Sequence, residues 1–424
     1  MSVPVTILCG ELGAGKTTLL SGLLEATERD IAVLVNDVGA VNVDADLVEA
    51  RTDLTTGEEV IALENGCICC SLGGELSRAV IQLWKEYNFE YLVVEASGVG
   101  EPEPIARQFV RGPAAGPYDL DAVITVVDSR RFYDRFGDSA ADEPPTRQGP
   151  DETGSRPLAD LLLEQVEFCD LLVVNKCDLV SAAERERVVA LLETLQPRAE
   201  VVTTEYGGVD PETLLDSERF DLEAATESAG WKQLLEDETE HEESNAAAHD
   251  HDHDHDHDHD HDHDHNHDHS HPPERYGIAV DTYHRQRPLH PKRFVALLAD
   301  LPDGLVRAKG LCWIANRERQ AITMSYAGTE TTLEVTGRWI ASLSDERQAA
   351  FRDSQPELTW DEEWGDRETR LALIGRNLAM DDLQTRLDHC LLTDDELDAD
   401  WSAFENPAPT GMGDVTTVVS DDQP

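Results

Sequence analysis

Gly10-Glu11-Leu12-Gly13-Ala14-Gly15-Lys16-Thr17 is a glycine-rich stretch that fits the pattern G-x-x-x-x-G-K-[ST] of a phosphate-binding loop. The apolar run Val5–Cys9 precedes it, and the amphipathic run Thr17–Glu28 follows it. A strand, a glycine-rich turn and a helix in this order are the context that the motif requires. Backbone N–H groups of such a loop point at an anion. The stretch therefore predicts a nucleotide-binding domain of the P-loop class.

The chemistry of the motif assigns roles to its side chains. We expect Lys16 to place positive charge at the β- and γ-phosphates and Thr17 to give an oxygen to Mg²⁺. The residues of this stretch predicted to bind the nucleotide are Gly10, Gly13, Ala14, Gly15, Lys16, Thr17 and Thr18. Glu95 ends the apolar run Tyr91–Glu95, and an acid in this position can orient the attacking water. Lys16, Thr17 and Glu95 are thus the predicted catalytic residues, and a strand-end acid without a catalytic role stays the alternative for Glu95.

Short apolar runs alternate with amphipathic stretches across the first half of the chain. The runs that predict strands are Val5–Cys9, Ile31–Asn36, Tyr91–Glu95, Ala122–Asp128, Leu171–Asn175 and Glu200–Thr204. The stretches that predict helices are Thr17–Glu28, Gly74–Tyr87, Leu158–Phe168 and Ala182–Leu195. This alternation indicates an α/β fold, a P-loop NTPase domain with a doubly wound, mostly parallel sheet. We assign it to residues 1–222, with an insertion at Asp134–Pro157 that is rich in Pro, Gly and acidic residues.

A second nucleotide motif follows a later strand. Asn175-Lys176-Cys177-Asp178 resembles the guanine-specific N-K-x-D loop. The resemblance implies that Asp178 accepts hydrogen bonds from the guanine ring, while Asn175 and Lys176 shape the pocket. The predicted nucleotide is therefore GTP, and the predicted reaction is the attack of water on its γ-phosphate.

Three thiols are crowded into the segment Gly66-Cys67-Ile68-Cys69-Cys70. Zn²⁺ favours thiolate ligands in tetrahedral geometry. On an extended chain Cys67 and Cys69 point to the same face, so Cys70 must turn to complete a three-sulfur site. Three local ligands leave the fourth position open, which suits a transfer site better than a closed structural one. Buried thiols or a redox pair are the alternative.

Residues 223–275 predict a disordered linker that is acidic and rich in His and Asp. Within it, residues 249–271 alternate His with Asp and contain 12 His but no apolar side chain that could be buried. Neutral imidazoles bind Zn²⁺, Co²⁺ and Ni²⁺, so we predict that this tract captures metal. A solvated acidic spacer is the alternative.

The pattern of strands and helices returns after the linker. Residues 276–397 predict a smaller α+β domain with strands at Gly277–Tyr283, Leu305–Ile314, Gln320–Tyr326, Thr332–Thr336 and Arg370–Gly375 and helices at Lys292–Leu298, Asp345–Asp353 and Asp382–Leu391. Residues 398–424 predict a disordered tail.

The charge of the chain is strongly acidic. The net charge is −53, with 87 acidic and 34 basic residues, which argues against nucleic-acid and anionic-membrane partners. Such a surface suggests a halophilic source, because high salt screens the self-repulsion. The start of the chain has no basic segment followed by an apolar one, so we expect a cytoplasmic protein whose cysteines are thiols.

The order of the motifs resembles the CobW family. G-x-x-G-x-G-K-T-T, L-x-N-G-C-I-C-C, a strand ending in E-x-S-G, and N-K-x-D follow one another as in that family. The second half of the chain also resembles the C-terminal domain of that family. The segments that carry this resemblance are Arg287-Pro288-Leu289-His290-Pro291, Arg307-Ala308-Lys309-Gly310 with Trp313, Trp364-Gly365-Asp366-Arg367, and Leu373-Ile374-Gly375. The segment that begins Asn36-Asp37-Val38-Gly39-Ala40 follows the second predicted strand, where a nucleotide-sensing switch is expected, and it departs from the family's usual N-E-F-G-E at Asp37 and Ala40.

The resemblance implies a GTP-dependent metal chaperone that loads zinc or cobalt into a client metalloprotein. The thiol ligands of the family then fall on Cys67, Cys69 and Cys70. Two alternatives stay open, namely a metal-buffering protein with a regulatory GTP site and a cobalt-handling protein of cobalamin synthesis. A homo-oligomer is also left open.

Overall fold

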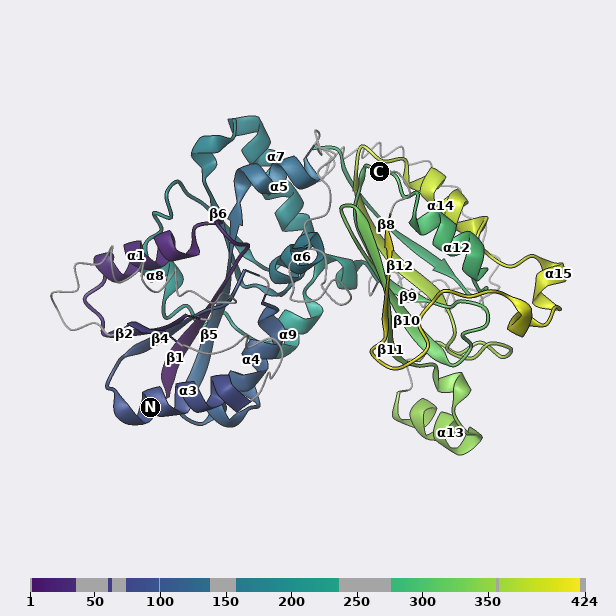
Figure 1. Cartoon of the computed structure of the whole chain (residues 1–424), viewed down its shortest axis with the longest axis horizontal. Helices are drawn as coiled ribbons and strands as arrows, with labels where there is room; N and C mark the ends of the chain where they lie inside the picture. The colour runs from purple at the N-terminus through teal and green to yellow at the C-terminus, as the bar shows by residue number, and fades with distance from the viewer. Residues whose placement is uncertain are drawn as a thin grey trace, which may run out of the picture. The chain divides into compact units, whose positions relative to one another are not determined.

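The computed structural model describes residues 2–35, 60–62, 74–98, 100–137, 158–235, 276–355 and 358–419 (Figure 1). These divide into two compact units, Met1–Gly230 and Trp231–Pro424. The first unit extends past the boundary at residue 222 predicted from the sequence, because the short helix α9, Leu222–Glu227, belongs to it. The prediction of a disordered linker from residue 223 is therefore wrong for residues 223–235, which include α9 and a helical turn at 230–235.

The first unit is built on a parallel sheet. Its seven described strands are β1 Val3–Cys9, β2 Ile31–Val35, β3 Val60–Ala62, β4 Tyr91–Glu95, β5 Tyr118–Asp128, β6 Leu171–Asn175 and β7 Glu200–Thr203. Their order is β3-β2-β4-β1-β5-β6-β7, and each neighbouring pair is parallel. The predicted α/β fold is therefore confirmed. β3 is a strand that the sequence reasoning missed, and β5 begins four residues earlier than expected.

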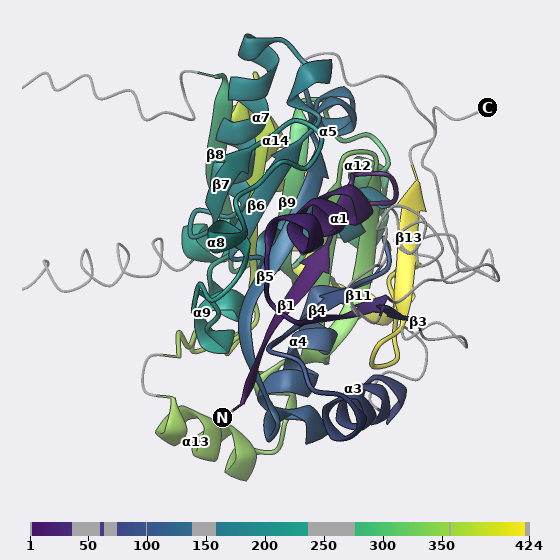
Figure 2. The ribbon, with the colours of Figure 1, turned by 90° about the vertical axis from the view of Figure 1, so that its left-hand side faces the viewer.

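Helices cover both faces of this sheet. They are α1 Lys16–Ala26, α3 Gly74–Glu86, α4 Pro102–Val110, α5 Ser129–Phe136, α6 Leu158–Phe168, α7 Ala182–Leu195 and α8 Pro211–Leu214, together with α9. In Figure 1, α1 and α8 lie on one side of the sheet and α6 on the other, and Figure 2 looks onto the α1 face. Leucines of α1 are buried against β1, β2 and β5, among them Leu20 at 1% exposed. Because α1 follows β1 along the chain, the loop that joins them lies at the carboxyl edge of the sheet.

The second unit has an antiparallel sheet. Its described strands are β8 Ile278–Arg285, β9 Leu305–Cys312, β10 Gln320–Ala327, β11 Glu330–Arg338, β12 Thr369–Arg376 and β13 Val415–Val419, in the order β13-β11-β10-β9-β12-β8. Two helices, α12 Pro291–Leu298 and α14 Met380–Asp388, bury Phe294, Leu297 and Leu387 in its core. A further helix, α13 Asp345–Ser354, has no buried residue. α14 begins and ends earlier than the predicted helix at 382–391.

The prediction of a disordered tail over residues 398–424 is wrong for residues 398–419. This segment contains the 3₁₀ turn Trp401–Ala403 and the strand β13, which pairs with β11 from Glu334↔Val415 to Glu330↔Val419. Arg317 donates hydrogen bonds to the carbonyls of Asn406 and Ala408, so the loop before the strand is fixed as well. The Val-Thr-Thr-Val-Val composition suits a strand, because β-branched side chains fit a pleated surface.

No helix in the described ranges is both long enough and apolar enough to cross a membrane.

Candidate nucleotide site

The glycine-rich loop has the backbone that only glycine adopts readily. Gly10, Gly13 and Gly15 have φ values of 139°, 80° and 109°. A Cβ atom on Gly15 would also lie 2.3 Å from Asn175 Nδ2. The loop therefore depends on glycine both for its turn and for its close approach to the loop after β6.

Lys16, the first residue of α1, is buried and lies within the loop. Its Nζ donates hydrogen bonds to the carbonyl oxygens of Gly10, at 2.8 Å, and Glu11, at 3.3 Å. The ammonium group is thus held inside the loop, where a phosphate would meet it. Thr17 and Thr18 follow in the first turn of α1, and both are partly exposed. The loop geometry, the lysine and the threonine hydroxyl fit a nucleotide phosphate with Mg²⁺.

Asn175 joins the phosphate loop to the loop after β7. Its Nδ2 donates to Ala14 O over 2.9 Å, and its Oδ1 accepts the backbone N–H of Gly207 over 3.0 Å. Both hydrogen bonds are buried. The first residue of the predicted guanine loop therefore holds the phosphate loop in place.

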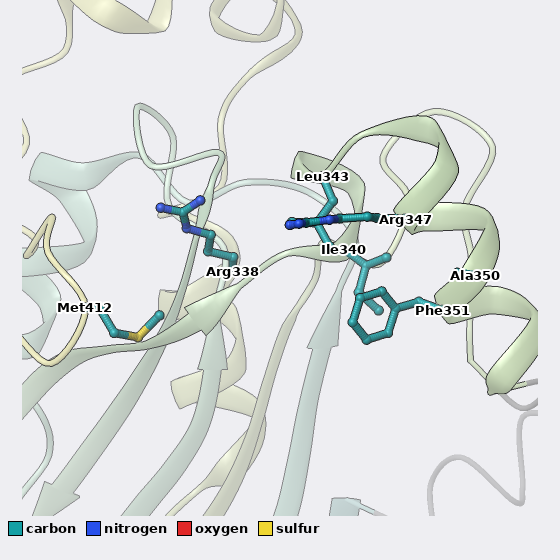
Figure 3. A pocket seen from close by; sticks show the side chains of 7 residues that line it. All are labelled: Arg338, Ile340, Leu343, Arg347, Ala350, Phe351 and Met412. Atoms are coloured by element: carbon teal, nitrogen blue, oxygen red, sulfur yellow. The ribbon is translucent and has the colours of Figure 1, made fainter.

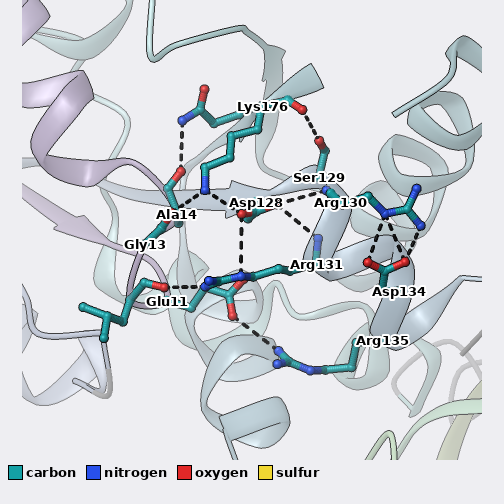
Figure 4. A network of polar contacts seen from close by, with 12 residues as sticks. Glu11, Gly13, Ala14, Asp128, Ser129, Arg130, Arg131, Asp134, Arg135 and Lys176 are labelled. Carbon is teal, nitrogen blue, oxygen red and sulfur yellow. Dashed lines mark hydrogen bonds and ion pairs between the residues drawn. The ribbon is translucent and has the colours of Figure 1, made fainter. Parts of the chain in front are cut away.

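Lys176 makes a second link to the same loop (Figure 4). Its Nζ donates to Gly13 O at 2.6 Å and to Asp128 Oδ2 at 2.7 Å. Asp178 lies in the following 3₁₀ turn, Cys177–Leu179, and is exposed. Its carboxylate makes no hydrogen bond or ion pair with the described residues. Two residues of the motif thus fix the loop, and the third is left open to a ligand.

Glu95 lies buried at the carboxyl end of β4, which pairs with β1. The turn after it packs on the phosphate loop, because a Cβ on Gly98 would lie 2.6 Å from the backbone N of Leu12. The structure therefore brings Glu95 to the same edge of the sheet as Lys16, Asn175 and Lys176.

Asp128 is a site residue that the sequence reasoning missed. It ends β5 and caps α5, accepting the backbone N–H groups of Arg130 and Arg131 at 3.1 Å each. Ser129 Oγ then donates to Lys176 O over 2.9 Å. The signal in the sequence was an Asp-Ser pair at the end of a strand, which is a common helix start.

The loop Thr204–Gly208 is the second part that was missed. Cys177 N donates to Thr204 O over 3.1 Å, so this loop lies beside the guanine motif. Thr204 Oγ1 donates to Gly208 O over 2.9 Å and stabilises the turn, in which Tyr206 is 75% exposed with φ 57°. Its position after the last parallel strand was the only signal available.

The described cysteines are free, buried thiols: Cys9, Cys169, Cys177, Cys312 and Cys390. Burial raises the pKa of the Cys9 thiol to about 12 and that of Cys390 to about 11. These thiols stay protonated, so they are poor metal ligands. Within the described ranges, no group of three or more His, Cys, Asp and Glu side chains could hold a metal ion.

Several sequence predictions lie outside the described residues. They are the thiols Cys67, Cys69 and Cys70, the switch positions Asp37 and Ala40, residues 138–157 of the predicted insertion, and the His-Asp tract at 249–271. The start of that insertion at Asp134 is wrong, because residues 134–136 form the last turn of α5.

The fold and the site define a class of protein. A parallel P-loop sheet with an N-K-x-D loop fastened to its phosphate loop is the core of a GTPase, here joined to an antiparallel second unit. The chain belongs to the CobW family of GTPases. The model of the CobW/HypB/UreG nucleotide-binding domain matches residues 4–203, and that of the cobalamin synthesis protein cobW C-terminal domain matches residues 278–391.

Relatives match over one or both domains. The chain is 33% identical over 418 residues to the zinc-regulated GTPase metalloprotein activator 1 of Dictyostelium discoideum, which covers 93% of this chain and 81% of that protein. It is 34% identical over 207 residues to the zinc chaperone CobW of Pseudomonas aeruginosa, covering 46% of this chain and 55% of that protein. The Zn(II)-bound YjiA GTPase from E. coli aligns at 18% identity and a TM-score of 0.35, over 92% of this chain and 100% of that chain.

Proposed function

We propose that this GTPase is a zinc metallochaperone, which binds the metal through Cys67, Cys69 and Cys70 and transfers it to a client metalloprotein. The names of two relatives support the choice of metal, since one is a zinc-regulated metalloprotein activator and the other a zinc chaperone. Thiolates are also preferred ligands of zinc.

The topology of the parallel sheet carries the proposal. β3 ends at Ala62, and its carboxyl end faces the same edge as those of β4 and β1, because the strands are parallel. Three strand spacings of about 4.8 Å separate β3 from β1, or about 14 Å. Cys67 follows Ala62 by five residues, which span at most about 17 Å. Five residues are therefore long enough to bring Cys67 from the end of β3 to the phosphates, and we propose that a change of nucleotide alters metal affinity through this proximity.

The proposed hydrolysis depends on positioning and charge. Lys16 stabilises the negative charge that develops at the γ-phosphate, and Glu95 orients the attacking water. Asp178 accepts hydrogen bonds from guanine, while Asn175 and Lys176 keep the phosphate loop in register with the base pocket. Mg²⁺ would supply positive charge against the phosphates, and the Thr17 hydroxyl is the protein oxygen that would hold it.

The test combines metal content with turnover. We expect Cys67→Ser/Cys69→Ser/Cys70→Ser to lose the tightly bound zinc and the effect of zinc on GTP turnover. Cys390→Ser serves as the matched control, because it changes a buried thiol in the other unit. Zinc release to a coloured chelator should follow GTP hydrolysis in the wild type. Turnover that ignores both zinc and the triple substitution would contradict the coupling, and negligible turnover with zinc still bound would indicate a metal buffer instead.

A second part of the proposal concerns residues 249–271. We propose that this His-Asp tract captures metal for the thiol segment, since imidazoles bind zinc when they are neutral. A chain lacking 249–271 should bind fewer zinc ions per protein while keeping its GTP turnover. Unchanged zinc stoichiometry would make the tract a spacer.

A further inference from the structure

Arg131 reaches the phosphate loop from a different element, α5 (Figure 4). Its Nη1 donates a hydrogen bond to Leu12 O over 2.6 Å. The same nitrogen lies 3.3 Å from the place that a side chain on Gly13 would occupy. Gly13 is also the residue whose carbonyl accepts the hydrogen bond from Lys176. The guanidinium group therefore lies at the outer rim of the loop that encloses the phosphates.

The surroundings of Arg131 leave its charge largely available. Its side chain is 54% exposed, and its distance to the nearest carboxylate oxygen in the described part of the chain, Asp128 Oδ2, is 3.9 Å. That oxygen already accepts a hydrogen bond from Lys176 at 2.7 Å. Arg135, one turn further on, faces Glu11 at 3.5 Å. Among the arginines of α5, Arg131 is thus the one whose guanidinium group donates to the loop backbone, and its ion pair with Asp128 is a long contact of 3.9 Å.

Arg130 provides a direct comparison on the same helix. Its guanidinium group is held by Asp134 and by Glu184, the latter at 3.1 Å, and it points away from the phosphate loop. Successive residues on a helix face different directions, so the two arginines are matched in chemistry but not in place.

We propose that Arg131 is a cis-acting arginine that leaves the Leu12 carbonyl and contacts the phosphates of GTP during hydrolysis. A guanidinium group that stabilises the charge developing on the γ-phosphate raises the rate without adding a reacting group. Asp128 fixes the first turn of α5 through its cap, so only the side chain of Arg131 has to move. The inference rests on the GTPase activity of the family and goes beyond it by naming the residue.

The test separates a role in the transition state from a role in the shape of the loop. Arg131→Ala should lower kcat by roughly 10³-fold or more, as the loss of an arginine finger does. Its affinity for the fluorescent nucleotide mant-GDP should stay near that of the wild type. Formation of the tight mant-GDP–aluminium fluoride complex should be lost in Arg131→Ala, and Arg130→Ala should retain both the rate and the complex. Unchanged kcat in Arg131→Ala, or loss of mant-GDP affinity to the same extent as kcat, would overturn the proposal.

A second and independent observation concerns the other unit. A hollow of about 590 Å³ lies between β11, α13 and the loop before β13, and Figure 3 shows its lining side chains. The lining includes Arg338, Ile340, Leu343, Arg347, Phe351 and Met412. Phe351 is 42% exposed and Met412 is 64% exposed. The hollow thus combines two exposed apolar side chains, Phe351 and Met412, with two arginines.

The charge of the hollow is opposite to that of the chain. Arg338 and Arg347 are both exposed, and neither guanidinium group has a hydrogen bond or ion pair with a described residue. The chain as a whole carries 87 acidic and 34 basic residues, whereas the charged side chains that line the hollow are both arginines. We infer that the hollow binds a segment of a partner protein in which apolar side chains are flanked by carboxylates.

The probe is a fluorescein-labelled peptide, Gly-Glu-Leu-Phe-Glu-Gly, compared with its twin that has Gln in place of both Glu. The Glu peptide should bind the full chain with a Kd below about 1 mM. It should bind about fivefold to tenfold tighter than the Gln peptide, and Arg338→Ala/Arg347→Ala should abolish this preference. Arg352→Ala on the same helix, whose guanidinium group lies over Trp360, should retain it. Equal binding of the two peptides, no binding at about 1 mM, or a dimer in sedimentation that Phe351→Ala dissociates would overturn the inference.

Discussion

Asn175→Ala is expected to detach the phosphate loop from the rest of the nucleotide site. In the folded protein the Asn175 side chain bridges Ala14 O, at 2.9 Å, and Gly207 N, at 3.0 Å. Truncation to alanine removes both bridges and leaves one buried carbonyl and one buried N–H group without a protein partner.

The magnitude follows from these two groups. Each buried polar group that loses its partner costs about 1–3 kcal/mol, so the closed arrangement of the loops loses about 2–6 kcal/mol. Since about 1.4 kcal/mol is a factor of ten, the low end of this range makes the open arrangement about 30-fold more populated. GTP affinity should fall by up to the same factor, because only the closed arrangement is competent to bind.

Hydrogen exchange with mass spectrometry measures this effect locally. Peptides that cover residues 10–18 and 204–209 should exchange faster in Asn175→Ala, while β9 in the other unit should be unchanged. Asn316→Ala is the matched control, because its amide donates to Phe404 O in the second unit. Unchanged exchange at 204–209, or an equal increase across both units, would refute the reasoning.

The remaining predictions concern the base, the second unit and salt. Asp178→Asn should weaken GTP and favour XTP in a competition assay, because an amide N–H can donate to the additional oxygen of xanthine; unchanged preference would remove Asp178 from the base pocket. Arg293, at 2.7 Å, holds the pKa of Glu396 down at about 2, so the pair stabilises the fold above the usual carboxyl pKa and loses this effect as the pH falls toward 2. The difference in Tm between wild type and Glu396→Gln should therefore shrink on acidification; a constant difference would contradict this. A chain that ends at residue 413 should lower the Tm of the second unit, because it uncovers the edge of β11. Finally, the Tm should rise steeply from dilute buffer to molar salt if self-repulsion of the −53 charge limits stability, and a flat response would argue against a halophilic source.

Much of the first unit could be predicted because its strands are buried on both faces. Tyr91–Glu95 and Leu171–Asn175 are continuous apolar runs, and the structure reproduces their bounds. β3 escaped notice because it has three residues, too few to show a pattern. β13 was missed for a different reason. It follows a segment rich in Pro and Gly near the end of the chain, and its pairing with β11 is a tertiary contact that no local pattern reveals.

The site shows the same division between local and non-local information. The glycine loop and the N-K-x-D loop are contiguous motifs, so their residues could be named from the sequence. Asp128 and Gly207 could not, because each acquires its role only when the sheet brings the ends of β5 and β7 beside β6. Arg131 is a further case, since its partner Leu12 lies 119 residues away in the sequence.

The contacts of Asn175 and Lys176 bear on how this protein can evolve. Because these residues hold the phosphate loop, a mutation at either position that adapts the pocket to another base also loosens the grip on phosphate. Asp178 does not hold the phosphate loop, because it is exposed and its carboxylate has no hydrogen bond or ion pair with a described residue. Substitutions at Asp178 can therefore change which base is preferred. Asn175 and Lys176 are more constrained, because they hold the phosphate loop, which binds the phosphates of any nucleotide.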